Sequence, residues 1–167
     1  MELLGTRLRH LLDTLERDVA AVYTDFGVEG MKPRFAPYLR LLESTGPMSI
    51  RDLATTIGVT HSAASQTVAE LRRRALVTVA AGDDARTRVV RLTEDGERLL
   101  PLVHREWAAT VAAAATLDAD LEYPLGRLVE EAIAALERRS MRERIADQLR
   151  PRSDVAGPGV DPGTPPL

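Results

Sequence analysis

The sequence predicts a mainly α-helical protein with one small β-hairpin. Ala and Leu dominate its apolar residues, and aromatic residues make up only 4% of the 167-residue chain, which favours packed helices over a β-sandwich. Apolar residues recur at steps of three and four along most of the chain. Only residues 77–93 contain two β-branched runs, which flank a turn rich in Gly and Asp. The apolar fraction of 44% is enough for a hydrophobic core.

Two helices are predicted in the first part of the chain. Leucines and valines at three- and four-residue steps predict an amphipathic helix over residues 2–26, which two glycines end. A second helix is expected over about residues 34–45, and Gly46-Pro47 ends it.

A short helix and a longer one come next, separated by a tight turn. Ser49 and Asp52 fit a capping box, in which the hydroxyl and the carboxylate satisfy backbone N–H groups, and Gly58 ends the short helix. Thr60 is the expected N-cap of the next helix, residues 61–75. At about 100° per residue, four residues of this helix should face the core: Ala64, Val68, Leu71 and Ala75.

Residues 77–93 are expected to form the β-hairpin, with strands at Val77–Ala81 and Val89–Thr93 joined by a basic loop. Positive charge is concentrated in this part of the chain. Residues 49–93 hold seven Arg against four acidic residues, a net +3, whereas the whole chain has a net charge of −3. A basic block suits a nucleic-acid partner, although clustered arginines often form only a solvated helix face.

The C-terminal part is predicted to be helical up to a tail rich in Pro and Gly. A long helix opens at Thr93 and runs to about residue 116, with a kink expected at Pro101. A last helix is expected over about residues 121–149. The tail from Pro151 has no apolar period and is interpreted as disordered.

The outward side of helix 61–75 carries small and polar residues first and basic residues last. Ser62, Gln66, Ala69 and Arg73 share this side. Small polar side chains let a helix backbone approach base edges in the major groove of B-DNA, and Gln66 can pair bidentately with adenine. The arginines suit phosphates. The candidate DNA contacts are Thr60, His61, Ser62, Ser65, Gln66, Arg72, Arg73 and Arg74. The alternative is an ordinary helical hairpin with a polar face.

A helix-turn-helix followed directly by a two-stranded basic hairpin is a winged helix. Asp84-Ala85-Arg86, followed by Leu92-Thr93 and Gly96, matches the D-x-R…L-T-x-x-G wing signature of the MarR family (multiple antibiotic resistance regulators). The chain resembles this family over about residues 1–149. LRRRALV at residues 71–77 is similar to the family's L-x-x-x-G-L-V, except that Ala75 stands where glycine is common.

The resemblance implies roles for the hairpin loop. Arg86 is expected to enter the minor groove, where a guanidinium suits the negative potential, and Asp84 is expected to steady it. Arg88 is a further candidate for a phosphate contact. The alternative for Arg86 and Arg88 is a solvated position.

The resemblance also implies a homodimer held by intertwined first and last helices. The alternative is that their apolar stripes close an intramolecular bundle. A two-fold dimer would bind a palindromic site, with its recognition helices about 34 Å apart. The expected organisation is residues 1–33 as N-terminal dimerisation helix and linker, 34–93 as winged helix-turn-helix, 94–149 as long helix and C-terminal dimerisation helix, and 150–167 as tail.

In the family, small anionic or aromatic molecules often bind between the dimer helices and the DNA-binding lobe. An arginine beside aromatic side chains suits an aromatic carboxylate. For each candidate, the alternative is that the side chain does not contact a ligand and is only a core or surface residue. The candidates for lining such a crevice are His10, Tyr23, Met31, Arg34, Phe35, Tyr38, His104 and Trp107.

The expected function is a homodimeric, sequence-specific DNA-binding transcriptional regulator, most often a repressor in this kind of family, released by a small ligand. The alternative is a winged-helix module that binds a protein instead of DNA. That alternative predicts apolar residues at the exposed positions of helix 61–75, which are polar. An enzyme is not expected, because the sequence has no Gly-rich phosphate loop and no nucleophile elbow.

No cofactor or metal site is expected, because the chain has no cysteine and only three scattered histidines. No apolar run is long enough to cross a bilayer, and the first residues mix acidic and basic side chains, unlike a signal peptide. The expected location is therefore cytoplasmic, with no membrane partner.

Overall fold

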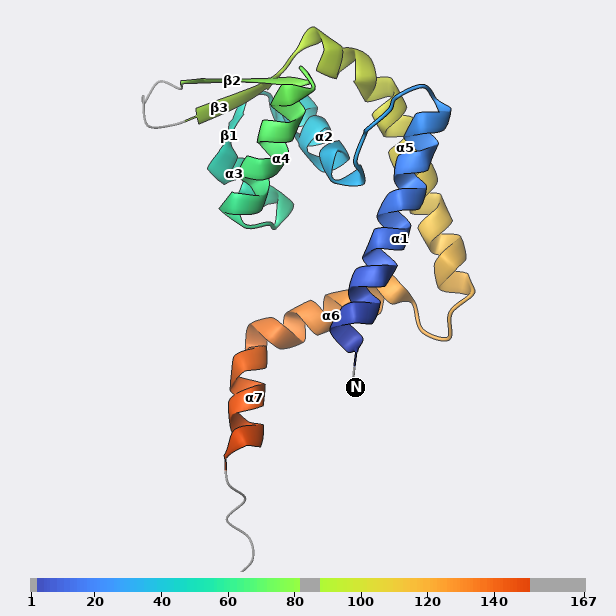
Figure 1. Cartoon of the computed structure of the whole chain (residues 1–167), viewed down its shortest axis with the longest axis vertical. Helices are drawn as coiled ribbons and strands as arrows, with labels where there is room; N and C mark the ends of the chain where they lie inside the picture. Colours follow the sequence, from blue (N-terminus) through green and yellow to red (C-terminus); the bar gives the residue numbers. More distant parts are fainter. Residues whose placement is uncertain (1–2, 82–87, 151–167) are drawn as a thin grey trace, which may run out of the picture. The chain divides into compact units, whose positions relative to one another are not determined.

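The structure, a computed structural model, describes residues 3–81 and 88–150 of the chain. The described part of the chain divides into two compact units, with the boundary between residues 115 and 116, and each is considered by itself. None of the described helices is long and apolar enough to cross a membrane. The elements follow one another as in Figure 1: α1 (Leu4–Asp25), the 3₁₀ turn η1 (Pro33–Phe35), α2 (Ala36–Thr45), β1 (Met48–Ser49), α3 (Ile50–Ile57), α4 (His61–Arg73), β2 (Val77–Ala81), β3 (Arg88–Leu92), α5 (Glu94–Ala119), α6 (Leu125–Arg138) and α7 (Met141–Leu149).

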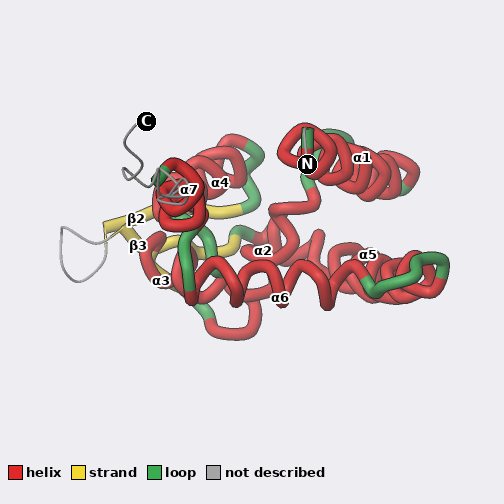
Figure 2. The backbone as a smooth tube through the Cα atoms, turned by 90° about the horizontal axis from the view of Figure 1, so that it is seen from below, coloured by secondary structure: helices red, strands yellow, loops and turns green. Residues whose placement is uncertain are grey.

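The first unit contains a small antiparallel sheet with the strand order β1-β3-β2 (Figure 2, yellow). The pairing of β2 with β3 runs from Val77 opposite Leu92 to Ala81 opposite Arg88, which confirms the predicted hairpin. The short strand β1 pairs with the other side of β3 and was not predicted. A strand of two residues shows no alternation of polar and apolar residues, so the sequence carries no signal for it.

The inner side of α4 packs into the core of the first unit. Ala64, Val68 and Leu71 are at most 2% exposed, as predicted, and Leu39 of α2 and Leu53 of α3 are fully buried in the same cluster. Burying such side chains supplies most of the stability of a small domain, at about 25 cal/mol per Å² of apolar surface. With its inner side fixed in the core, α4 presents its other side to solvent.

The prediction that Ala75 also faces the core is wrong. α4 ends at Arg73, Ala75 is exposed, and Leu76 is buried instead. The N–H of Ala75 donates to the carbonyl of Arg72, and the N–H of Leu76 donates to that of Leu71, both at 3.0 Å. This is a Schellman helix end, whose left-handed residue is usually glycine. Ala75 occupies that position with φ 57°, where a Cβ is unfavourable.

The start of α5 packs directly on this helix end. The hydroxyl of Thr93 donates to the carbonyl of Ala75 at 2.5 Å and accepts the N–H of Gly96 at 3.0 Å. The N–H of Thr93 donates to the carbonyl of Leu76 at 3.2 Å. A Cβ on Gly96 would lie 2.2 Å from that same carbonyl oxygen, so only glycine fits. The L-T-x-x-G part of the sequence signature therefore has a structural reason.

The structure confirms the predicted start of α4 and differs in detail from the predicted start of α3. The hydroxyl of Thr60 accepts the N–H of Ala63 at 3.2 Å, so the predicted N-cap of α4 is confirmed. The hydroxyl of Ser49 accepts the N–H of Asp52 at 3.0 Å, but it also donates to the Asp52 carboxylate at 2.7 Å. The carboxylate thus accepts a hydrogen bond from the hydroxyl of Ser49, whereas in the predicted capping box it would accept one from the backbone N–H of Ser49.

The prediction of one last helix over residues 121–149 is wrong. The second unit contains two helices in this range, α6 and α7. The chain turns at Arg139, whose backbone is extended (φ −153°). Ser140 then starts α7 with a capping box: its hydroxyl accepts the N–H of Glu143, and the Glu143 carboxylate accepts the N–H of Ser140 at 2.8 Å. The sequence signal for this box, Ser140-x-x-Glu143, was present and missed.

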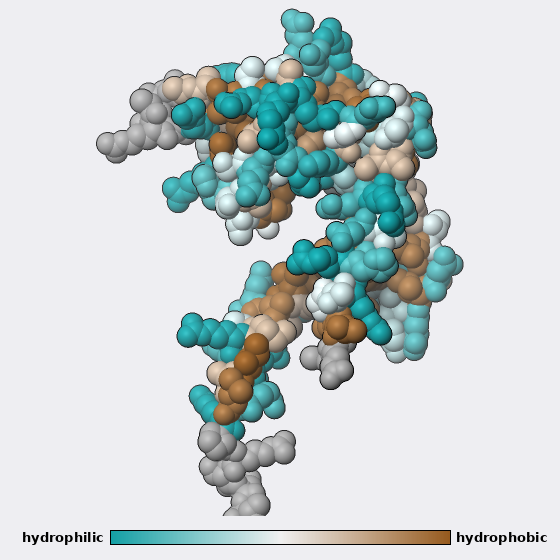
Figure 3. Space-filling model, in the orientation of Figure 1, coloured by the Kyte–Doolittle hydropathy of each residue, from teal (hydrophilic) through white to brown (hydrophobic). Residues whose placement is uncertain are grey.

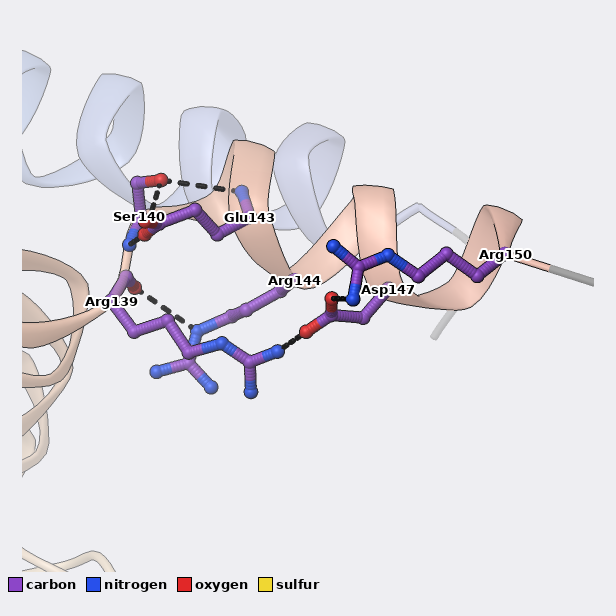
Figure 4. A network of polar contacts seen from close by, with 6 residues as sticks. All are labelled: Arg139, Ser140, Glu143, Arg144, Asp147 and Arg150. Atoms are coloured by element: carbon purple, nitrogen blue, oxygen red, sulfur yellow. Dashed lines mark hydrogen bonds and ion pairs between the residues drawn. The ribbon is translucent and has the colours of Figure 1, made fainter.

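Arginine side chains hold the corner between α6 and α7 (Figure 4). Arg144 donates to the carbonyls of Ala135 and Arg139, at 3.0 and 3.2 Å, and so satisfies carbonyl groups at the end of α6. Asp147 is paired with both Arg139 and Arg150. Because several contacts cross the turn, the two helices form a defined corner.

We predict that Ala75→Gly raises the free energy of unfolding by about 0.5–1 kcal/mol, because it removes a Cβ from a left-handed position. The measurement is urea unfolding followed by circular dichroism. Ala109→Gly, at an exposed position inside α5, is the matched control and should instead lower stability by about 1 kcal/mol. A loss of stability in both variants would contradict the prediction.

Candidate nucleic-acid interface

The outer side of α4 is a surface of small polar and basic side chains. Most of the residues proposed from the sequence lie on it or at its start, and only Ser65 is half-buried. The exposed residues are Thr60, His61, Ser62, Gln66, Ala69, Arg72 and Arg73. This outer side buries nothing within the described chain, so its composition needs a reason other than folding.

One flank of α4 is fixed by polar contacts to α2 and to the segment that precedes it. Thr67 is 5% exposed and hydrogen-bonded to the hydroxyl of Tyr38. Glu70 pairs with Lys32 at 2.7 Å and with Arg34 at 2.9 Å. Thr67 and Glu70 are three residues apart and therefore lie on one side of the helix.

The two cations change the electrostatics of Glu70. The hydrogen bond from Lys32 is the main cause that holds the pKa of the Glu70 carboxyl below its ordinary value, with Arg34 adding to it against a smaller opposing effect of burial. Glu70 is therefore ionised at neutral pH and acts as an anchor for both side chains. Sequence reasoning missed this cluster, because its residues are 36 and 38 positions apart.

Arg74 does not join the outer side of α4. Its guanidinium donates to the backbone carbonyl of Glu29, in the loop after α1. All three consecutive arginines are exposed, and the hydrogen bond to Glu29 directs the side chain of Arg74 toward the loop after α1. The phosphate contacts of the three arginines stay predictions, with Arg72 and Arg73 on the outer side of α4.

The hairpin next to α4 carries the remaining candidates. Arg88 is exposed and begins β3, opposite Ala81 of β2. Asp84 and Arg86, on which the wing signature depends, lie outside the described residues. The structure therefore gives the two strands that lead to the loop, and the roles of Asp84 and Arg86 stay predictions.

The MarR family model matches residues 29–87, from the loop before α2 into the hairpin. This winged helix-turn-helix is a MarR-family domain. The order of its elements, α2-β1-α3-α4-β2-β3, is the one shown in Figure 1.

Solved structures share the fold over most of the chain. The chain is similar to the M. tuberculosis transcriptional regulator MOSR in complex with DNA, with 23% identity and a TM-score of 0.61, over 89% of this chain and 99% of that chain. It is similar to a mutant of E. coli MarR complexed with operator DNA, with 14% identity and a TM-score of 0.59, over 81% and 94% of the two chains. It is also similar to the S. aureus MepR–DNA complex, with 15% identity and a TM-score of 0.58, over 80% of this chain and 94% of that chain. No curated protein matches the chain by sequence.

Several of the proposed ligand contacts are core residues of the first unit. Tyr23 of α1 is fully buried, and its hydroxyl donates to the carboxylate of Glu106 of α5 at 2.7 Å. Thr110 donates to the other oxygen of that carboxylate at 2.5 Å. Burial, with the neighbouring carboxylate, raises the pKa of Tyr23 well above its ordinary value. Met31, Phe35 and Tyr38 are at most 3% exposed.

The remaining ligand candidates have partners near the surface. Arg34 is bound to Glu70, and Nε2 of His104 lies 2.6 Å from a carboxylate oxygen of Glu43. His10 lies on α1 in a shallow groove of that helix. Trp107 is half-buried and stacks under the guanidinium of Arg40, 4.4 Å from its ring centroid.

Arg40 is a residue that sequence reasoning missed. Its Nε is buried and has no hydrogen-bond partner among the described residues. A buried donor without an acceptor is unfavourable by about 1–3 kcal/mol. The sequence analysis proposed Arg34 beside aromatic residues, and the structure shows that Arg40 also lies beside an aromatic ring, that of Trp107.

We predict that Glu70→Gln lowers the free energy of unfolding by up to about 1 kcal/mol at pH 7, because two partly exposed cations, Lys32 and Arg34, lose the carboxylate with which they pair. Since the pKa of Glu70 is lowered by folding, its ionised form stabilises the protein above the ordinary pKa of 4.5, and this stabilisation disappears as the pH falls through the lower folded value.

Urea unfolding at pH 7 and at about pH 3 tests this prediction. The difference between wild type and Glu70→Gln should shrink in acid. Glu97→Gln, which removes an exposed carboxylate of α5, is the control. An equal difference at both pH values would show that the ion pairs are not the cause.

Proposed function

We propose that the protein is a homodimeric transcriptional regulator that binds DNA in a sequence-specific manner and acts as a repressor. The observation that carries the proposal is the outer side of α4. It is exposed, small and hydrogen-bonding at its start, and basic at its end. Its inner side is at the same time fixed in the core.

The side chains of α4 suit the major groove. Gln66 has the donor and acceptor needed to pair with adenine, and Ser62, one turn before it, can bond to a base or a phosphate. Thr60 and His61 start the helix, where side chains enter the groove first. Arg72 and Arg73, in the last turn, suit the phosphates of the two strands.

The hairpin would add a second contact. Arg86 is proposed for the minor groove, with Asp84 orienting it, and Arg88 for a phosphate. The exposed position of Arg88 at the start of β3 supports its part of this proposal. The three similar structures that contain DNA also support a DNA partner for this chain.

A homodimer accounts for the exposed apolar side chains of both units. In the first unit, α1 exposes Leu4, Leu8, Leu12, Leu15 and Val22. In the second unit, apolar side chains run along α6 and α7 (Figure 3, brown), including Leu128, Val129, Ile133, Leu136 and Ile145. No residue of α6 or α7 is buried. Contiguous apolar surface of this kind marks an interface, and a second copy supplies the same surface by symmetry. A two-fold dimer would require a palindromic site.

We also propose that a small aromatic or anionic ligand releases the DNA. The guanidinium of Arg40 stacks on Trp107, and its Nε, which has no hydrogen-bond partner among the described residues, supports this part of the proposal. A carboxylate would satisfy that donor, and an aromatic ring would suit the neighbouring indole. Of the residues proposed from the sequence, Trp107 and His104 lie on the same helix, α5.

The second candidate function, a winged-helix module that binds a protein, is less well supported. A protein interface has an apolar or aromatic centre. The exposed residues of α4 are polar, basic or small. Gel-shift titration on genomic fragments at two salt concentrations separates the two functions, because only DNA binding gives retardation that weakens with salt.

We predict that Gln66→Ala changes the preferred DNA sequence more than the total affinity, because a base-edge contact discriminates by about 1–3 kcal/mol while phosphates supply much of the affinity. Selection from a random DNA pool measures both. Ala69→Ser, on the same exposed side, is the control. Identical selected motifs for wild type and Gln66→Ala would contradict base reading by Gln66.

We predict that Ile133→Glu weakens the dimer by about 100-fold or more, because it places a charge in an apolar interface. Ile133 is 54% exposed in one chain, so the monomer should still fold. Sedimentation equilibrium measures the dimer, and circular dichroism measures the helix content. Glu131→Ala, which removes an exposed pair with Arg127, should leave the dimer intact. An unchanged dimer in Ile133→Glu would exclude this face.

A further inference from the structure

A second basic site lies beside α4, on the segment that leads from α1 to α2. The Nζ atom of Lys32 is 2.7 Å from one oxygen of Glu70, and the guanidinium of Arg34 is 2.9 and 3.1 Å from the two oxygens. Two cations on one carboxylate leave a net charge of +1 at this place. Lys32 and Arg34 are still 46% and 41% exposed, whereas Glu70 is 20% exposed.

The backbone that carries Lys32 is held firmly in place. The neighbouring side chains Met31 and Phe35 are each 1% exposed and belong to the core. Gly30 has φ 67°, and a Cβ there would lie 2.6 Å from the guanidinium of Arg74. Lys32 therefore projects from a well-packed segment, which lowers the entropy that binding a partner would cost.

The site flanks the proposed DNA-reading side of α4. At about 100° per residue, Glu70 lies roughly 40° around the helix from Gln66. An α-helix with side chains is about 10–12 Å across and the major groove about 12 Å wide, so groups on the flank of the reading side approach the phosphates of one strand. Glu70 alone would repel that strand, and the two cations reverse the sign of the charge.

We propose that Lys32 binds a backbone phosphate of the DNA, as a contact separate from those of α4 and the hairpin. The proposal rests on the proposed function. Arg34 holds the Glu70 carboxylate and also lies 5.8 Å from the centroid of the Phe35 ring, so it is the more confined of the two cations. Lys32 has three donors and one described acceptor, so it can reach a phosphate oxygen while keeping Glu70.

A purely structural role accounts less well for Lys32. α4 is already tied to this segment by Arg34 and by Arg74 on the carbonyl of Glu29, and to α2 by the hydrogen bond of Tyr38 with Thr67. A further cation on Glu70 at the solvent side adds little stability. It adds a positive charge at the place where a phosphate strand would pass.

The first experiment compares DNA affinity and its salt dependence for full-length wild type, Lys32→Gln, Lys32→Arg and the control Arg17→Gln. Arg17 is an exposed cation of α1, paired only weakly with Asp18 at 3.5 Å. Lys32→Gln should weaken binding about 3- to 10-fold on every sequence, and the slope of log K against log[salt] should fall by about 0.9 for each phosphate that is no longer neutralised. Lys32→Arg should keep the slope, and Arg17→Gln should match wild type.

The second experiment uses the fact that Lys32 is the only lysine of the chain. An amine-selective acetylating reagent therefore modifies Lys32 and the α-amino group. Bound DNA should slow acetylation of Lys32 several-fold and leave the α-amino group unchanged, as measured by mass spectrometry. Equal rates of Lys32 acetylation with and without DNA would overturn the inference.

The outcomes separate this inference from the proposed function. If the wild type shows no salt-sensitive DNA binding, the proposed function fails. If the wild type binds and Lys32→Gln matches Arg17→Gln in affinity and slope, only the Lys32 contact fails. Urea unfolding of Lys32→Gln verifies that the variant is folded, and an unchanged selected motif is expected, since a phosphate contact carries no base information.

Discussion

The junction at Ala75 and Leu76 determines how the first unit is assembled. The carbonyl of Ala75 accepts the hydroxyl of Thr93, and the carbonyl of Leu76 accepts its N–H. One threonine at the end of the hairpin thus binds the end of α4 and starts α5. These bonds fix where the hairpin meets the end of α4. The close approach of Gly96 to the Leu76 carbonyl leaves no room for a larger residue.

The two sides of α4 are governed by different forces. Ala64, Val68 and Leu71 hold it in the core by apolar burial, and because they lie on one side of the helix they decide which side faces inward. The polar contacts of Thr67 with α2 and of Glu70 with the segment before α2 are directional and further fix its rotation. Burial and the polar flank together supply stability and orientation, so the outer side needs to do neither. That freedom lets it carry side chains chosen for a partner.

The sequence predicted the parts that depend on neighbouring residues. The N-cap of α4 at Thr60 and the two strands of the hairpin follow from local patterns, and the structure confirms them. The division between α6 and α7 was also local, in the capping box of Ser140 and Glu143, and was missed because the apolar period continues across it. Ala75 was misplaced because a helical wheel assumes that the helix continues, whereas α4 ends at Arg73.

The sequence by itself determined the helices, their caps, the hairpin and the polar character of the outer side of α4, because each depends on residues a few positions apart. Only the tertiary structure decided the rest. The pairing of β1 with β3, the bond of Tyr23 with Glu106 and the two cations on Glu70 join residues that are distant in the chain. Such contacts form only when packing has brought their backbones within hydrogen-bond range, and no local pattern in the sequence encodes that distance.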